Sequence, residues 1–356
     1  QDRRRPALPD HPPHGAPQKL LRGGGRLGFI VSNKVLAADY GTPLRELLVS
    51  SLAIEQMVDI SQLEMFEGAS TYPHIIIIRK PRRSIEAKEN ETLLLSRLKV
   101  SDGVIQVPSQ AERVPQRFFQ ELPNCILSPA LSVEKFRIIE RMRRNTTLLS
   151  EVLEINCGIA RTGFSKHVLT KTQYSKLAEK EKQVTRPFLT AGDVLRYSTR
   201  KKGYLTYSAA LATPEQWQEF GEPKILFAGI GKHLRVALDQ EGCALGRVYY
   251  SILKKNPVNP YFLIAVLNSR LVNAYYSLLF GATHLRGGYI RYNATYLQKI
   301  PIPPSTESRQ EAELVELATQ AIQKPSLLKQ GLDSKINQCV ASLYGLKPEE
   351  VTVLEG

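Results

Sequence analysis

Arginine and tyrosine side chains gather beside glycines in the second half of this 356-residue chain. An arginine guanidinium can donate two hydrogen bonds to one guanine edge, and a tyrosine ring can stack on an exposed base. These side chains therefore predict a surface that contacts nucleic acid, and a salt-bridged loop is the structural alternative. Four of them lie in segment 283–292: Arg286, Tyr289, Arg291 and Tyr292. Lys232, directly after the Gly-Ile-Gly segment 229–231, is expected to join them.

Two earlier segments carry the same types of side chain. The segment 158–163, Gly-Ile-Ala-Arg-Thr-Gly, has glycines that permit positive φ and a close approach of backbone to a ligand. The segment 188–197 ends in Arg196, whose planar guanidinium donates hydrogen bonds, and Tyr197, whose aromatic ring lies next in the sequence. We predict contacts to phosphate or base edges here too, although a cross-strand aromatic ladder is the alternative for the tyrosine. The residues concerned are Arg161, Thr162, Arg196 and Tyr197.

Apolar periodicity predicts the elements that position these residues. A buried strand at 224–228 pairs with 235–238, and two apolar helices at 261–268 and 271–280 lead into segment 283–292. A helix at 133–144 has one apolar side and one arginine-rich side, which faces either solvent or phosphate. Other predicted elements are a strand at 249–253, a strand pair within 92–107, and helices at 110–120, 214–220, 307–324 and 332–344.

The charge balance agrees with an anionic partner. The chain has 48 Lys and Arg against 34 Asp and Glu, a net charge of +14 and a pI near 9.6. Such a balance favours nucleic acid, although a basic protein without that partner shares it. Four scattered cysteines and six histidines show no metal-ligand spacing, so we expect no metal and buried free thiols, as in a reducing cytoplasm. No apolar run reaches the ~18 residues of a membrane helix, and we expect no membrane partner.

The first hundred residues predict part of an α/β sheet. A continuous apolar run at 27–31 predicts a strand buried on both faces, and Pro43 sits at the start of a helix. Strands are expected at 54–60 and 74–78. Strand, helix, strand, strand is the edge of such a sheet and not a whole one.

From residue 23 to the end, the order of motifs resembles the N6-adenine DNA methyltransferases that carry a C-terminal target-recognition domain. The resemblance implies methyl transfer from S-adenosylmethionine to a flipped adenine, and it places Phe66 where an aromatic ring stacks on that base. An ordinary core position is the alternative for Phe66. The matching motifs are Leu267-Asn-Ser269, Tyr275-Tyr276, Ile300-Pro-Ile-Pro303, the Gly-Ile-x-x-Thr-Gly loop at 158–163 and the Gly-Asp-Val-x-Arg-Tyr run at 192–197.

The family's glycine-rich cofactor turn and its Asn/Asp-Pro-Pro-Tyr/Phe motif have no complete copy in this sequence. Gly23-Gly-Gly25 does not follow a predicted strand, and Asn259-Pro-Tyr-Phe262 has one proline and is expected to begin a helix. We therefore expect no catalytic residue in this chain. S-adenosylmethionine is implied by the resemblance alone.

The predicted fold is α/β: the C-terminal strands of a Rossmann-like methyltransferase sheet, then a mixed α/β target-recognition domain and C-terminal helices. We expect a disordered tail (1–25), a methyltransferase remnant (26–80), connecting elements (81–148), a recognition domain (149–304) and terminal helices (305–356). The predicted function is recognition of double-stranded DNA, with activity only beside a chain that carries the missing N-terminal half. A non-enzymatic nucleic-acid-binding module and a complete methyltransferase with an unrecognised cofactor site remain as alternatives.

Overall fold

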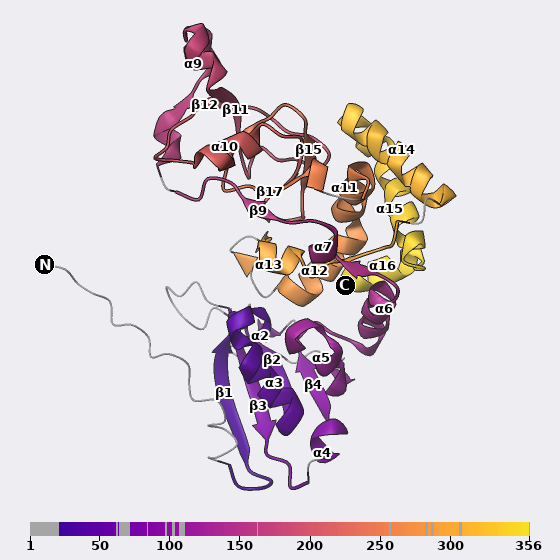
Figure 1. Cartoon of the computed structure of the whole chain (residues 1–356). Helices are drawn as coiled ribbons and strands as arrows, with labels where there is room; N and C mark the ends of the chain where they lie inside the picture. Colours follow the sequence, from indigo (N-terminus) through magenta and orange to yellow (C-terminus); the bar gives the residue numbers. More distant parts are fainter. Residues whose placement is uncertain are drawn as a thin grey trace, which may run out of the picture. The chain divides into compact units, whose positions relative to one another are not determined.

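The computed structural model describes residues 21–355 (Figure 1), apart from 62, 64–71, 84, 97, 102–103, 107–110, 162, 256–257, 282–283, 286–287 and 306–307. Phe66 and most of the predicted tail lie outside the described residues. The chain forms two compact units. Unit 1 is Gln1–Arg137 with Leu278–Thr283, and unit 2 is Ile138–Ser277 with His284–Gly356.

Unit 1 is built on a five-stranded sheet in the order β1-β3-β2-β4-β7. Strands β2 and β4 are parallel, and the other neighbours are antiparallel. The isoleucine run of β3 lies between β1 and β2, where β-branched side chains pack well on a pleated surface. The strands are β1 (Arg26–Ser32), β2 (Ala53–Asp59), β3 (Pro73–Arg79), β4 (Glu91–Leu95) and β7 (Glu112–Pro115), with a separate hairpin of β5 (Lys99–Ser101) and β6 (Val104–Gln106).

The helices of unit 1 are short, and a buried arginine joins them. The guanidinium of Arg45 donates to the carbonyl oxygens of Val35 and Ala38, each at 2.7 Å, and to that of Asn124 at 3.0 Å. These acceptors compensate the cost of burying its charge. The helices are α2 (Asn33–Ala37), α3 (Thr42–Ser51), α4 (Ile85–Lys88), α5 (Arg117–Glu121) and the 3-10 turns η1 (Asp39–Gly41) and η2 (Pro123–Cys125); α6 spans Val133–Arg143.

Two predictions for unit 1 are wrong. The run 27–31 forms β1 as predicted, but Ile30 is 57% exposed because β1 pairs only with β3 among the described strands. The helix predicted at 110–120 is instead strand β7 followed by the short α5. Pairing of β7 with β4 outweighs local helix propensity here, and the buried Gln116 separates the two by accepting the Ile54 N–H at 2.7 Å.

Unit 2 contains two four-stranded sheets, ordered β10-β12-β11-β16 and β15-β13-β17-β9, a three-stranded sheet β14-β19-β18 and the pair β20-β8. The strand pairing predicted between 224–228 and 235–238 is confirmed by β13 and β15. The strands are β8 (Thr147–Leu148), β9 (Asn156–Cys157), β10 (Val168–Leu169), β11 (Thr185–Thr190), β12 (Gly203–Thr206), β13 (Lys224–Phe227), β14 (Ile230–Gly231), β15 (Val236–Asp239), β16 (Ala244–Gly246), β17 (Tyr249–Ile252), β18 (His284–Leu285), β19 (Tyr289–Arg291) and β20 (Pro301–Ile302).

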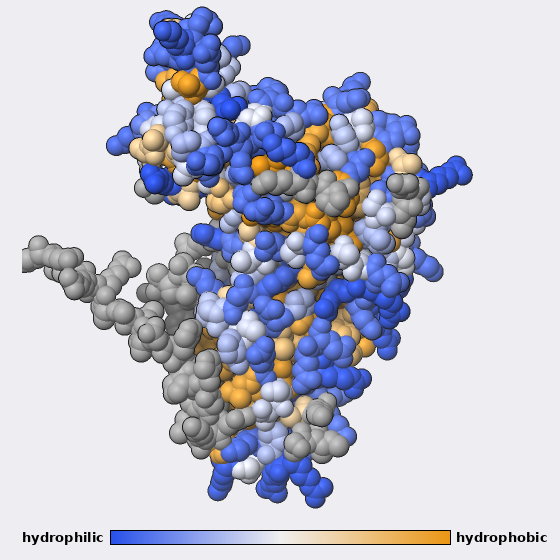
Figure 2. All heavy atoms as spheres, viewed as in Figure 1, coloured by the Kyte–Doolittle hydropathy of each residue, from blue (hydrophilic) through white to orange (hydrophobic). Residues whose placement is uncertain are grey.

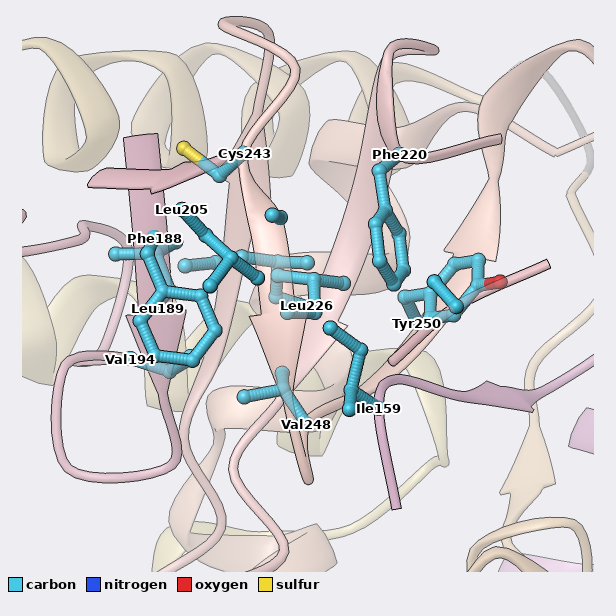
Figure 3. Packing of buried hydrophobic residues seen from close by; sticks show 14 of the residues in the cluster. Ile159, Phe188, Leu189, Val194, Leu205, Phe220, Leu226, Cys243, Val248 and Tyr250 are labelled. Carbon is cyan, nitrogen blue, oxygen red and sulfur yellow. The ribbon is translucent and has the colours of Figure 1, made fainter. Parts of the chain in front are cut away.

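One apolar core joins the two larger sheets (Figure 3). Phe188 and Leu189 of β11 belong to the same buried cluster as Leu226 of β13 and Tyr250 of β17, and all four side chains are at most 5% exposed. Trp217, the only tryptophan, packs against this cluster from α10. Its fluorescence therefore reports on the folding of unit 2.

The helices predicted for unit 2 are present. Asn259 caps α11 by accepting the Tyr261 N–H at 2.9 Å, so Asn259-Pro-Tyr-Phe262 begins a helix as predicted. Gly345, at φ +65°, follows the end of α15, where L side chains are strained. The helices are α7 (Leu149–Val152), η3 (Phe164–His167), α8 (Lys171–Ser175), α9 (Glu179–Gln183), α10 (Pro214–Phe220), η4 (Leu253–Lys255), α11 (Pro260–Asn268), α12 (Arg270–Phe280), α13 (Ala294–Leu297), α14 (Arg309–Gln323), η6 (Pro325–Gln330), α15 (Leu332–Leu343) and α16 (Pro348–Glu355).

Three general expectations can be compared with the described residues. They contain no cluster of three metal-ligating side chains. They contain no single helix long and apolar enough to cross a membrane, although α11 and α12, bent by 59°, meet that test as a pair. The expectation of buried thiols holds only for Cys243, because Cys157 is exposed and the other two cysteines are partly exposed.

A buried ion pair joins β13 and β15 in unit 2. Lys224 and Asp239 lie opposite each other, with Nζ and Oδ2 2.6 Å apart and side chains 0% and 3% exposed. Lys224 also donates to the carbonyl oxygens of Phe220 and Glu222. Burial alone would raise the pKa of Asp239, but Lys224 and two backbone N–H donors hold that pKa below its usual value. Burial lowers the pKa of Lys224, and Asp239 opposes that shift. The contact between the two side chains fixes the register of the two strands.

We predict that Lys224→Met lowers the free energy of unfolding by about 3–5 kcal/mol, because it leaves a buried carboxylate without its counter-ion. Denaturant unfolding followed by Trp217 fluorescence measures this. Lys254→Met is the matched control, since Lys254 pairs with Glu222 on the surface, where such pairs contribute up to about 1 kcal/mol. Equal effects of the two substitutions would contradict a structural role for the buried pair.

Candidate nucleic-acid interface

The three-stranded sheet of unit 2 presents part of the predicted contact set to solvent. Along β19, Tyr289 and Arg291 are exposed and Ile290 between them is buried, as strand alternation requires. Ile230 of β14 pairs with Arg291 and is 40% exposed. The outward face of this small sheet therefore combines a cation, an aromatic ring and an apolar side chain.

Lys232 completes this surface. Its ammonium lies 5.9 Å from the centroid of the Tyr289 ring, which is 45% exposed. A cation at that distance is attracted by the ring face and leaves the other face open for stacking. We call Ile230, Lys232, Tyr289 and Arg291 the β14–β19 patch. Three of the predicted contact residues thus come together, while Arg286 lies outside the described residues.

Two exposed arginines, Arg247 and Arg161, lie on segments that pack beside the strand leading to β14. Arg247 follows β16 at φ +54°, and its N–H donates to the carbonyl oxygen of Ile159 at 3.1 Å. Its own carbonyl oxygen would lie 3.8 Å from a Cβ at Gly229, next to β14. Arg161, two residues beyond Ile159, is exposed and donates to the carbonyl oxygen of Ala210. Sequence reasoning missed Arg247, because a lone arginine after a short strand carries no pattern.

The positive φ predicted for segment 158–163 is confirmed at Gly163, whereas the close backbone approach at Gly158 is to the chain itself and the predicted approach to a ligand stays a prediction. A Cβ at Gly158 would lie 2.5 Å from the carbonyl oxygen of Leu245, a distance that side-chain-bearing residues do not reach. Gly163 has open space around it, but its φ of +92° is one that residues with a side chain rarely adopt, so glycine is favoured here by backbone conformation. Thr162 lies outside the described residues, and its contact with DNA stays a prediction.

Arg196, Tyr197 and Tyr292 are occupied within the fold. Arg196 donates to Asp333 Oδ1 at 2.5 Å and to the carbonyl oxygen of Asn268 at 3.0 Å. Tyr197 is 1% exposed, and burial raises the pKa of its phenol far above the usual value. Tyr292 is fully buried, with its ring centroid 4.7 Å from that of Tyr276. Contacts of these three with DNA stay predictions, and burial favours a packing role for the two tyrosines.

The turn between α11 and α12 fixes the strand that leads to the patch. The side chain of Asn268 accepts the Val236 N–H at 3.0 Å and donates to the Val236 carbonyl oxygen at 2.8 Å. Asn273 accepts the Leu234 N–H at 2.5 Å, and Ser269 Oγ accepts the Val272 N–H to cap α12. The buried side-chain amides of Asn268 and Asn273 thereby bond to backbone groups at and just before the start of β15.

Arg235 ties the same segment to β14. Its Nη2 donates to the carbonyl oxygens of Ile230 at 2.9 Å and Ala191 at 3.1 Å. The stretch from Ile230 to Val236 is therefore held at both ends, by Arg235 and by Asn268. Neither role was assigned from the sequence, because a hydrogen bond to a distant backbone group leaves no local pattern.

Comparisons with known proteins agree with this geometry. Residues 186–302 match the family described as the TaqI-like C-terminal specificity domain. This part of the chain is a specificity domain of the TaqI-like kind. Both the β14–β19 patch and Asn268 lie inside the matched range. Arg161 precedes it, as does everything before β11.

Curated relatives extend the likeness beyond the specificity domain. The chain is 25% identical to the type II methyltransferase M.PaeR7I of Pseudomonas aeruginosa, over 94% of this chain and 64% of that protein. It is 23% identical to M.XhoI of Xanthomonas vasicola, over 80% of this chain and 60% of that protein. The chain thus spans less than two thirds of the length of these relatives.

Among solved structures, the type IIL restriction–modification enzyme MmeI, determined in complex with DNA, has a similar fold. The TM-score is 0.57 at 12% identity, over 93% of this chain and 48% of that one. At this identity the likeness establishes the fold, a mixed α/β architecture shared with a restriction–modification enzyme.

We predict that Asn268→Ala in the specificity domain lowers the free energy of unfolding by about 1–3 kcal/mol, because it leaves the buried Val236 N–H without an acceptor. Trp217 fluorescence during denaturant unfolding measures the change. Asn156→Ala is the control, since Asn156 is partly exposed on β9 and such substitutions usually stay within about 0.5 kcal/mol. A loss no larger than that of the control would show that the amide does not hold β15.

Proposed function

We propose that this chain is the DNA-recognition portion of an adenine-specific, S-adenosylmethionine-dependent DNA methyltransferase of a restriction–modification system. The observation that carries the proposal is the place of the β14–β19 patch: it lies within the residues that match a specificity domain. Arg291 supplies donors for a base edge, Tyr289 a ring for stacking, and Lys232 a charge for phosphate. The net charge of +14 supports a polyanionic partner.

We further propose that unit 1 is the C-terminal part of a Rossmann-like methyltransferase sheet and that residues 149–304 form the recognition domain. The relatives named as methyltransferases support this, because their likeness covers most of the chain. In this arrangement Phe66 stacks on a flipped adenine, and the methyl donor is S-adenosylmethionine.

We propose that unit 1 does not bind S-adenosylmethionine by itself, because two strand-to-helix passages among its described residues lack the glycines which that cofactor requires. That cofactor needs a glycine-rich turn between a strand and a helix, but β1 passes to α2 through Ser32, and β7 passes to α5 through Gln116. Gly24 and Gly25 instead exchange backbone hydrogen bonds with Lys80 at 2.7 and 2.9 Å. We therefore propose that this chain acts beside a segment or chain that carries the cofactor site and the Asn-Pro-Pro-Tyr motif.

Two measurements separate this proposal from its alternatives. If six to ten phosphates are neutralised, affinity for duplex DNA falls about 10³–10⁵-fold between 50 and 200 mM salt. The proposal is contradicted if the affinity for duplex DNA does not change with salt concentration, or if structured RNA competes better than duplex DNA. Incorporation of labelled methyl groups into duplex DNA by the purified chain would show instead that it is a complete enzyme.

We predict that Arg291→Ala weakens binding to the preferred duplex, selected from random sequences, by about 1–3 kcal/mol, or roughly 5–150-fold, relative to a random duplex. Loss of a bidentate base contact reduces discrimination more than general affinity. Arg309→Ala, at an exposed position on α14, is the control and should leave the ratio unchanged. An Arg291→Ala chain with full discrimination would remove Arg291 from base recognition.

A further inference from the structure

A lysine-rich projection of unit 2 lies outside the part of the chain that matches the specificity domain. It consists of residues 165–183, which run from η3 through β10, α8 and α9, and we call it the α8–α9 arm. In Figure 1, α9 extends away from β11 and β12, and Figure 2 shows predominantly hydrophilic residues at this end. The arm has five lysines and one histidine against two glutamates.

Both glutamates of the arm are engaged locally. Glu179 pairs with Lys182 at 2.7 Å, and Glu181 accepts the Ala178 N–H at 2.9 Å. The other four lysines are exposed, and none of them pairs with a carboxylate in the part of the chain that the structure describes. These four are Lys166, Lys171, Lys176 and Lys180.

The arm is fixed to the sheet beneath it. The ring of Tyr174 stacks on that of Tyr204 with centroids 3.9 Å apart and planes 4° apart. Thr185 Oγ1 donates to the Glu181 carbonyl oxygen at 2.7 Å, which holds the end of α9. A Cβ at Gly203 would lie 2.7 Å from Val168 Cγ1, so β10 lies close against β12. Its lysines are therefore presented on a fixed support, which lowers the entropic cost of using them.

The base of the arm adjoins the basic surface of the specificity domain. The Phe164 ring would lie 3.1 Å from a Cβ at Gly246, immediately before Arg247. Arg247 in turn bonds to Ile159 and lies beside Gly229, next to the β14–β19 patch. The backbone around Arg247 thus lies between the β14–β19 patch and Phe164, two residues before Lys166 of the arm.

We propose that the α8–α9 arm binds the phosphate backbone of duplex DNA beside the bases that the β14–β19 patch reads. This inference rests on the proposed DNA recognition. Lysine acts as a point charge toward phosphate, whereas the ring of Tyr174, the arm's only tyrosine, is already stacked on Tyr204. The arm therefore adds affinity without adding sequence preference.

The test replaces the four exposed lysines together: Lys166→Gln, Lys171→Gln, Lys176→Gln and Lys180→Gln. The control chain carries Lys324→Gln, Lys329→Gln, Lys335→Gln and Lys347→Gln, which are exposed positions in and between the C-terminal helices of the same unit. Both variants lower the net charge from +14 to +10, since four charges are removed from fourteen. Unfolding followed by Trp217 fluorescence confirms that both remain folded.

Four phosphate contacts correspond to a salt slope of about 3.6, so the wild-type chain should lose about 100-fold more affinity between 50 and 200 mM salt than the arm variant does. The loss should be equal for the preferred duplex and a random duplex, and the control should follow the wild type. An arm variant that follows the control overturns the proposal and leaves DNA recognition intact. Loss of structured-RNA binding alone also overturns it. A wild-type chain that binds no duplex overturns both proposals.

Discussion

The side chain of Asn268 is the contact on which the recognition surface depends. It accepts the N–H of Val236 on the edge strand β15 and donates to the Val236 carbonyl oxygen, which also accepts the N–H of Tyr197 at 3.0 Å. Without it the Val236 N–H would be buried with no partner, at a cost of about 1–3 kcal/mol. The Leu-Asn-Ser turn between α11 and α12 therefore attaches this helix pair to β15. Arg196 adds to the joint by linking Asn268 to Asp333 of α15.

The segment held by Asn268 is connected to β14, which pairs with β19. On β19, buried and exposed side chains alternate. Ile290 and Tyr292 are buried and hold the small sheet in place, while Tyr289 and Arg291 alternate with them and face solvent. Outward residues on such a strand can be exchanged at little cost to packing. The fold thus separates residues that maintain a surface from residues that give it chemistry, as a scaffold for different DNA sequences requires.

Much of the fold was predictable from the sequence, because tertiary contacts did not override the strong local patterns. The helices at Pro214–Phe220 and Pro260–Asn268 and the β13–β15 pairing follow directly from caps and apolar runs. Segment 112–115 was missed because its pairing with β4 is long-range, and the edge position of β1 depends on what lies beside it. Strand neighbours are set by tertiary structure, which a single run of residues does not encode.

The candidate site divides in the same way. Lys232 and Tyr289 follow glycines and are exposed together with Arg291, whereas contact of these three side chains with DNA stays a prediction. Tyr197 and Tyr292, which follow arginines, are buried instead, since the side to which a ring points depends on the neighbouring element. The roles of Arg235 and Asn268 were not predicted because their partners are backbone groups, which every residue possesses. The charge of the α8–α9 arm was visible in the sequence, but its anchoring through Tyr204 was not.

The most direct test of the account combines amide hydrogen exchange with DNA affinity in the Asn268→Ala chain. Exchange of the Leu234 and Val236 amides reports whether the joint is open, and affinity for the preferred duplex reports whether the patch is still presented. The account predicts that both change together: faster exchange at these amides and weaker, less selective binding. Fast exchange with unaltered affinity and selectivity would show that DNA is read elsewhere on the molecule.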